Sequence, residues 1–194
     1  RSWRGLIEHR RSLVDQIESS TSRISDLVRA IKEYTYMDQA SVQDVDIVRS
    51  LENTLIILNH KLKRGVTVHR QYPDRPLLVS SFGSELNQVW TNLIDNASDA
   101  MDGKGDLDVR AFQDDDCVVV EIGDSGSGIP AEVQPRIFEP FFTTKGVGQG
   151  TGLGLDTVHR IVRKHKGSIS FTSRPGRTVF QVRLPMSNPA FKPS

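Results

Sequence analysis

Two asparagines stand four residues apart in the stretch NLIDN, at Asn92 and Asn96. This spacing places both side chains on one face of a helix. A buried amide needs hydrogen-bond partners, because leaving it unpaired costs about 1 to 3 kcal/mol, and capping of loop backbone would meet that need. An amide oxygen is also a hard ligand that suits Mg²⁺, which takes few protein oxygens together with phosphate and water. The pair alone leaves both interpretations open.

An aspartate followed by two glycines forms a second candidate site. Asp124 ends an apolar run and precedes Gly126 and Gly128, so the chain can turn sharply and approach a flat ligand closely. A carboxylate at this place could accept a hydrogen bond from an exocyclic amine such as that of adenine. A hairpin turn capped by the aspartate explains the same residues.

A glycine-rich string precedes a predicted helix and forms a third candidate site. Its glycines are Gly148, Gly150, Gly152 and Gly154. Backbone N–H groups and the positive end of the helix would together attract an anion such as phosphate. Lys145 lies before the string and no Gly-Lys-Ser/Thr sequence follows it, so this is not the Walker pattern. A merely flexible loop is the alternative explanation.

The periodicity of apolar residues indicates which elements position these sites. Helical spacing predicts helices over residues 6–37, 45–62, 84–101 and 153–165. Alternation or short apolar runs predict strands over residues 66–72, 77–81, 106–112, 117–124, 167–173 and 178–185. Residues 128–151 have no clear period and are predicted to form a long loop, which often serves as a lid or binding loop. The irregular alternation favours an α+β fold, with a mixed sheet covered by helices.

Size and charge narrow the function classes. A chain of 194 residues fits one domain with a smaller extension. With 25 basic and 24 acidic side chains the net charge is +1, which gives no reason to expect nucleic-acid or membrane-surface binding. Cys117 is the only cysteine, and no long apolar run is present, so we expect a cytoplasmic protein without membrane contact by this chain. Helical sequence begins almost at Arg1, as in a piece of a longer protein.

Five segments, taken in order, resemble the conserved boxes of sensor histidine kinases of two-component systems. This is one branch of the ATPase superfamily that also holds gyrase, the Hsp90 chaperones and MutL. The segments are ELNQVWTNLIDNASDAM, GDSGSGIP, FEPFFTTKG, GQGTGLGL and PGRTVFQVRLP. They correspond to the asparagine box, the first glycine box, the phenylalanine box, the second glycine box and the closing strands. The resemblance covers about residues 45–185, and NASDAM is most similar to the nitrogen-regulation subgroup.

The resemblance implies a two-layer α/β sandwich, in which three helices back a mixed sheet and ATP lies under a mobile lid. A long dimerisation-type helix would precede it. The expected domains are residues 1–42 as a partial dimerisation and phosphotransfer region, residues 43–188 as the catalytic ATP-binding domain, and residues 189–194 as a tail.

The resemblance also implies site residues for ATP and Mg²⁺. Asn96 would hold Mg²⁺ against the triphosphate, while Asn92 and Lys145 would act in catalysis, the lysine reaching the γ-phosphate. Asp124 would receive the adenine amine, with Thr178 adding a water-linked contact. Phe138, Phe141 and Phe142 would anchor the lid. The further expected nucleotide contacts are Asp99, Gly126, Gly128, Ile129, Thr143, Thr144, Gly150, Thr151, Gly152, Leu153, Gly154 and Leu155, besides Phe138 and Asn92.

The reaction that the resemblance implies is phosphoryl transfer. Hydrolytic relatives carry a glutamate four residues before the Mg²⁺-binding asparagine, where this chain has Asn92, and an amide cannot accept a proton near neutral pH. Transfer depends mainly on positioning and charge neutralisation. Asp99 stands where many sensor kinases have a lysine, so a lysine contact to phosphate at that position is not supported. An ATP-hydrolysing member and a non-catalytic nucleotide-binding module are the alternatives.

The expected acceptor is a histidine followed by an acidic residue on the first helix of a dimeric hairpin. His9 is followed by arginine, and the other four histidines fall in or beside the nucleotide domain. Residues 23–38 resemble the second helix of that hairpin, so the acceptor is expected to be missing from this chain. The expected partners are a response-regulator receiver domain and a second copy of the chain, joined through the N-terminal helix.

Overall fold

The computed structural model describes residues 42–144 and 152–186, together with Val28. Its main sheet has five strands in the order β2-β4-β5-β7-β6. They are β2 (Val66–Gln71), β4 (Gly105–Asp114), β5 (Cys117–Asp124), β6 (Ser168–Arg174) and β7 (Arg177–Pro185). Only β2 and β4 pair in parallel, and the other neighbours are antiparallel. The mixed sheet of the predicted α+β fold is therefore confirmed.

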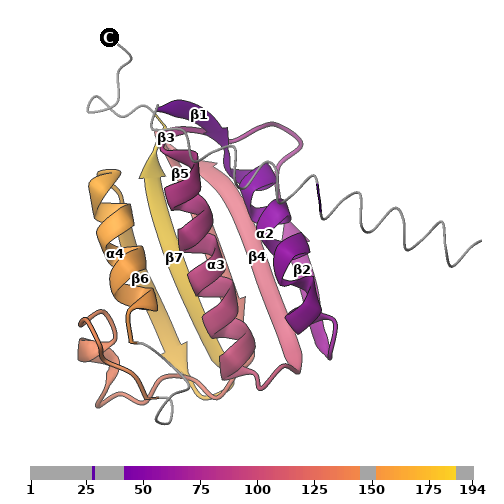
Figure 1. Ribbon diagram of the computed structural model, residues 1–194, viewed down its shortest axis with the longest axis vertical. Coiled ribbons are helices and arrows are strands. Elements are labelled where there is room, and N and C mark those ends of the chain that lie inside the picture. Colours follow the sequence, from indigo (N-terminus) through magenta and orange to yellow (C-terminus); the bar gives the residue numbers. More distant parts are fainter. Residues whose placement is uncertain (1–27, 29–41, 145–151, 187–194) are drawn as a thin grey trace, which may run out of the picture.

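Three helices cover one face of this sheet (Figure 1). They are α2 (Ile47–Leu62), α3 (Gly83–Ala100) and α4 (Gly154–Lys164), with α3 in the middle. The apolar face predicted for α3 is buried, and it consists of Leu86, Val89, Trp90, Leu93, Ile94 and Ala97. Alternate residues of the central strand β5, namely Val118, Val120 and Ile122, pack in the same core. Each large side chain buried there contributes about 1.5 to 3 kcal/mol of transfer free energy.

The predicted start of the second helix is wrong. Val45 belongs to the strand β1 (Gln43–Asp46), which pairs antiparallel with β3 (Leu78–Ser81) in a separate two-stranded sheet. The helix begins at Ile47, because Asp46 is its N-cap and accepts a hydrogen bond from the N–H of Val48 at 3.1 Å. Val45 is apolar and 1 % exposed, and it precedes Val48 by three residues. It therefore matches the helical spacing of buried residues, although its backbone is extended.

The predicted long loop contains one short regular element in its described part, the 3₁₀ helix η1 (Gln134–Arg136). One hydrogen bond attaches the start of the loop to β6, and a second lies within the loop. The N–H of Ile129 donates to Ser173 Oγ on β6 at 2.8 Å, and Gln134 Nε2 donates to the carbonyl oxygen of Ile129 at 2.8 Å. Ile137 is buried in the core. The first part of the loop is therefore fixed to the sheet.

The long N-terminal helix and the C-terminal tail predicted for this chain lie outside the described residues, apart from Val28 and residue 42. The domain boundary near residue 43 stays a prediction. Within the described part of the chain, no helix is both long enough and apolar enough to span a bilayer.

Candidate nucleotide-binding site

A cavity of about 770 Å³ lies at one end of α3, between the end of β5, the loop that follows it and the start of α4. Its volume is within the range of roughly 300 to 1,000 Å³ that is usual for small-molecule sites. Most of the expected site residues that the structure describes line it, and they are Asn92, Asn96, Asp99, Asp124, Gly128, Ile129, Thr143, Thr144, Gly152, Gly154, Leu155 and Thr178. The structure thus brings together residues that are more than 80 positions apart in the sequence.

The asparagine pair on α3 faces the N-terminus of α4. A Cβ atom at Gly154, the first residue of α4, would lie 3.5 Å from Asn92 Oδ1 and 3.9 Å from Asn96 Nδ2. The N-cap residue of α4 is Leu153, whose side chain cannot accept hydrogen bonds from the first-turn N–H groups. The backbone N–H groups of the first turn of α4 could therefore donate hydrogen bonds to an anion beside the two amides, and the positive end of the helix would attract it.

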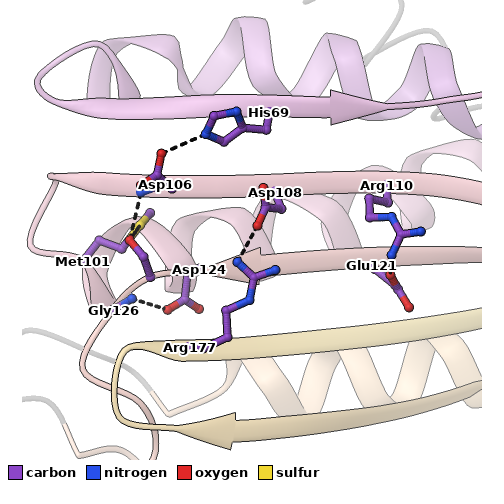
Figure 2. A network of polar contacts seen from close by, with 10 residues as sticks. His69, Met101, Asp106, Asp108, Arg110, Glu121, Asp124, Gly126 and Arg177 are labelled. Atoms are coloured by element: carbon purple, nitrogen blue, oxygen red, sulfur yellow. Dashed lines mark hydrogen bonds and ion pairs between the residues drawn. The ribbon is translucent and has the colours of Figure 1, made fainter.

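Asp124 lines the cavity from the end of β5. It is 3 % exposed, and its Oδ1 accepts a hydrogen bond from the N–H of Gly126 at 2.9 Å (Figure 2). Desolvation raises the pKa of this carboxyl above its usual range, while the Gly126 N–H and the charge of Arg177 act in the opposite direction. No other hydrogen bond from a described residue reaches the carboxylate, so its second oxygen can accept one from a ligand.

The turn after Asp124 depends on glycine at position 126. A Cβ atom there would lie only 2.5 Å from the carbonyl oxygen of Ala100, at the end of α3. The same oxygen accepts a hydrogen bond from the N–H of Ser127 at 3.2 Å. Close contact between the turn and α3 therefore requires the absence of a side chain. Ala100 and Ser127 line the cavity, whereas Gly126, which was expected to contact the nucleotide, does not.

Thr178 on β7 lies directly opposite Asp124 on β5 in the sheet. It is buried, and its Oγ1 is 2.9 Å from Ser173 Oγ on β6. Because Ser173 also accepts the hydrogen bond from Ile129, it connects Thr178 to the loop. Ser173 was not predicted from the sequence. Its position five residues before Thr178, across the hairpin, was the available signal.

The phenylalanines near the lid differ in their positions. Phe138 does not line the cavity, and its ring packs instead against His159 and Phe171, with centroid distances of 5.5 and 6.0 Å. Phe142 does line the cavity, and the guanidinium carbon of Arg136 lies 4.5 Å from the centre of its ring. Phe141 is 75 % exposed. The expected contact from Phe138 is therefore not found at the cavity surface.

Of the remaining expected residues, only Leu153 is among those that the structure describes. Leu153 is exposed beside Gly152 and is not part of the cavity lining. Lys145, Gly150 and Thr151 lie outside the described residues, so their predicted roles stay predictions.

Several lining residues were not predicted from the sequence. They are Lys61, Asp95, Ala97, Ala100, Ser127, Pro130, Ile137 and Phe180, and Phe142 was expected only as a lid anchor. Lys61 comes from α2 and forms an ion pair with Asp95 on α3. The hydrogen bond to Asp95 raises the pKa of Lys61, desolvation opposes this, and the charges of Asp95 and Asp99 raise it further.

Comparisons with known proteins agree with this geometry. Residues 83–188 match the family described as "Histidine kinase-, DNA gyrase B-, and HSP90-like ATPase". The "Sensory histidine kinase/phosphatase NtrB" of Rhodobacter capsulatus is 32 % identical over 94 % of this chain and 55 % of its own length. The "Sensor histidine kinase ZraS" of Escherichia coli is 32 % identical over 90 % of this chain and 38 % of its own length. The chain thus spans about half or less of these relatives.

Solved structures show the same fold. The catalytic domain of histidine kinase ThkA, in a nucleotide-free form, has a TM-score of 0.69 at 28 % identity, covering 75 % of this chain and 96 % of that domain. The mycobacterial sensor histidine kinase MprB has a TM-score of 0.67 at 27 % identity, covering 74 % of this chain and 97 % of that one.

Proposed function

Because this chain belongs to the histidine kinase-, DNA gyrase B- and HSP90-like ATPase family, we propose that its cavity binds ATP with Mg²⁺ as the catalytic core of a sensor histidine kinase. The chain would transfer the γ-phosphate to a histidine, in the cytoplasm, for relay to an aspartate of a response regulator. The observation that carries the proposal is that one cavity is lined both by a buried carboxylate and by an amide pair that lies beside a helix N-terminus.

At the carboxylate side, we assign Asp124 to the adenine amine. Its Oδ1 is held by the N–H of Gly126, which leaves Oδ2 to accept a hydrogen bond from the base. Burial makes this hydrogen bond stronger than it would be in water. Thr178 is the neighbouring polar group on the sheet, where a water-linked contact to the base would fit.

At the amide side, we assign the phosphates to Asn92, Asn96 and the first turn of α4. Among the described residues, no group of three or more His, Cys, Asp or Glu could hold a metal ion. An ion at this place would depend on an amide oxygen of Asn96 together with phosphate and water, which is the coordination that Mg²⁺ prefers. When bound, Mg²⁺ would neutralise charge on the β- and γ-phosphates.

Transfer is favoured over hydrolysis because the cavity lacks a suitable water-activating base. Asn92 occupies the position where hydrolytic relatives carry glutamate, and its amide cannot take a proton. Neither of the two carboxylates nearby, Asp95 and Asp99, stands at the position of that glutamate, and Asp99 lies on the exposed part of the helix. None of the described histidines lines the cavity. The acceptor would therefore be presented from elsewhere in the parent protein, and a homodimer formed through its N-terminal helix would be the means.

The test is to incubate the chain with ATP labelled at the γ-phosphate and a separately made helical segment of the parent protein that carries the acceptor histidine. We expect acid-labile label on histidine. Sustained phosphate release without the acceptor would instead identify an ATP hydrolase. Binding of ATP without transfer, even in the complete parent protein, would identify a non-catalytic module.

A further inference from the structure

The cavity contains one cation that belongs to none of the recognised sequence boxes. Lys61 lies in the last turn of α2 and lines the cavity that Asn92 and Asn96 also line. It is the only lysine or arginine among the described lining residues, whereas three of those residues are carboxylates, namely Asp95, Asp99 and Asp124. Lys61 is therefore the one described lining residue whose charge would attract the phosphates of a triphosphate in this cavity.

The positions on α3 bring Lys61 to the phosphate side of the cavity. Asp95 directly precedes Asn96, and Asp99 follows Asn92 by seven residues, so it lies on the same face of the helix two turns later. Lys61 pairs with Asp95, and the field of Asp99 also acts on it. The ammonium group is therefore held at the edge of the asparagine pair, and the flexible four-carbon stem of lysine lets it move.

The present partner of Lys61 holds it only weakly. The side chains of Lys61 and Asp95 are 42 % and 35 % exposed, and ion pairs with this exposure add little to the stability of a fold. A phosphate group, which carries more negative charge than a single carboxylate, would attract the ammonium group more strongly. While Lys61 is paired, the hydrogen bond to Asp95 raises its pKa and favours the charged ammonium form.

We propose that Lys61 leaves Asp95 when ATP binds and contacts the terminal phosphate. This supplies from α2 the positive charge that position 99, an aspartate in this chain, does not provide. The inference rests on the proposed function, and it makes Lys61 a residue that positions the γ-phosphate and distinguishes ATP from ADP. Asp95 is the residue that pairs with Lys61 when no nucleotide is bound.

The test compares the affinities of MgATP and MgADP, measured by calorimetry, for the unchanged chain and for Lys61→Gln, Lys61→Arg and Lys63→Gln. Losing one charge-assisted contact weakens MgATP binding by about tenfold, and MgADP binding should change much less. Lys61→Arg should retain most of the affinity. Lys63 is exposed at the C-cap of the same helix and does not line the cavity, so Lys63→Gln removes an equal charge and should have no effect.

Asp95→Asn adds a second test. Releasing Lys61 should strengthen MgATP binding, and this gain should shrink in the double variant with Lys61→Gln. Unfolding of the nucleotide-free Lys61→Gln variant should match that of the unchanged chain, because the pair is half-exposed. Equal affinities for MgATP with and without Lys61 would overturn the inference alone, and so would equal losses for both nucleotides. Failure of the unchanged chain to bind either nucleotide would overturn the proposed function as well.

Discussion

Asp124→Asn should leave the stability of the fold unchanged or higher at pH 7, while it weakens nucleotide binding. In the nucleotide-free chain the carboxylate is almost fully buried, and desolvation raises its pKa above the usual 3.8. The usual pKa applies to the unfolded chain, and the raised pKa applies to the folded chain. Between them the folded state holds more protons than the unfolded state, so the contribution of Asp124 to stability falls as pH rises through that interval. Asparagine is neutral, has nearly the same shape, and its Oδ1 can still accept the hydrogen bond from Gly126. At pH 7 the variant should therefore be as stable as the unchanged chain or more stable.

Nucleotide binding by the same variant should be strongly weakened. Because Gly126 fixes Oδ1 at 2.9 Å, the new amide would turn its NH₂ group toward the adenine amine, and two donors would face each other. Losing a hydrogen bond to a charged acceptor costs about 1.5 to 3 kcal/mol, and a buried donor without a partner costs about 1 to 3 kcal/mol. The combined loss is about 3 kcal/mol or more, which corresponds to at least about a hundredfold higher Kd for ATP.

Thermal unfolding from pH 4 to 8 and calorimetric titration with MgATP provide the assay. Asp106→Asn is the matched control, because Asp106 lies on the neighbouring strand β4, is exposed, and does not line the cavity. The stability of Asp124→Asn relative to the unchanged chain should increase from pH 4 to 7. A variant that loses stability at pH 7 and still binds MgATP normally would refute the reasoning.

Three further changes test other parts of the account. Gly126→Ala should lower the free energy of unfolding by about 2 kcal/mol or more, because its Cβ would overlap Ala100; unchanged stability in denaturant titration would contradict the close contact. His165 Nδ1 donates a hydrogen bond to the carbonyl oxygen of Ile161 (2.9 Å), its Nε2 is hydrogen-bonded to Ser81 Oγ (2.7 Å), and burial lowers its pKa below 6.5. The unfolded state then binds more protons, so stability should fall as pH drops below about 6.5, and His165→Gln should reduce this slope in denaturant titrations at pH 5 and 7.5. Asn92→Glu should increase phosphate release without acceptor, because it adds a general base; an unchanged rate would argue against the assigned role of position 92.

Local periodicity was sufficient to predict most of the fold. The buried face of α3 and the limits of β5 could be predicted from the spacing of their apolar residues, because these residues are the ones that pack in the core. The start of α2 was misplaced because a buried apolar residue at position 45 is compatible with either a helix or a strand. The capping hydrogen bond from Val48 to Asp46 is what marks the first residue of the helix. The pairing of β1 with β3 joins segments about 35 residues apart, and no local pattern specifies such a pairing.

The site was predictable where the chemistry is encoded in one short motif. Asn92, Asn96 and Asp124 line the same cavity, as the motifs indicated. Lys61 was not found, because its partner Asp95 is 34 residues away on another helix. Phe138 was expected to contact the nucleotide and Phe142 only to anchor the lid, but Phe142 lines the cavity and Phe138 does not. Packing against Phe171 draws Phe138 away from the cavity surface.

The most direct test of the central claim is a calorimetric comparison of MgATP and MgGTP binding to the unchanged chain. If the Asp124 carboxylate reads the exocyclic amine of adenine, MgATP should bind at one site, and MgGTP should bind at least about a hundredfold more weakly, because guanine presents a carbonyl acceptor to the carboxylate. Absence of binding heat with MgATP, or equal affinities for the two nucleotides, would contradict the account.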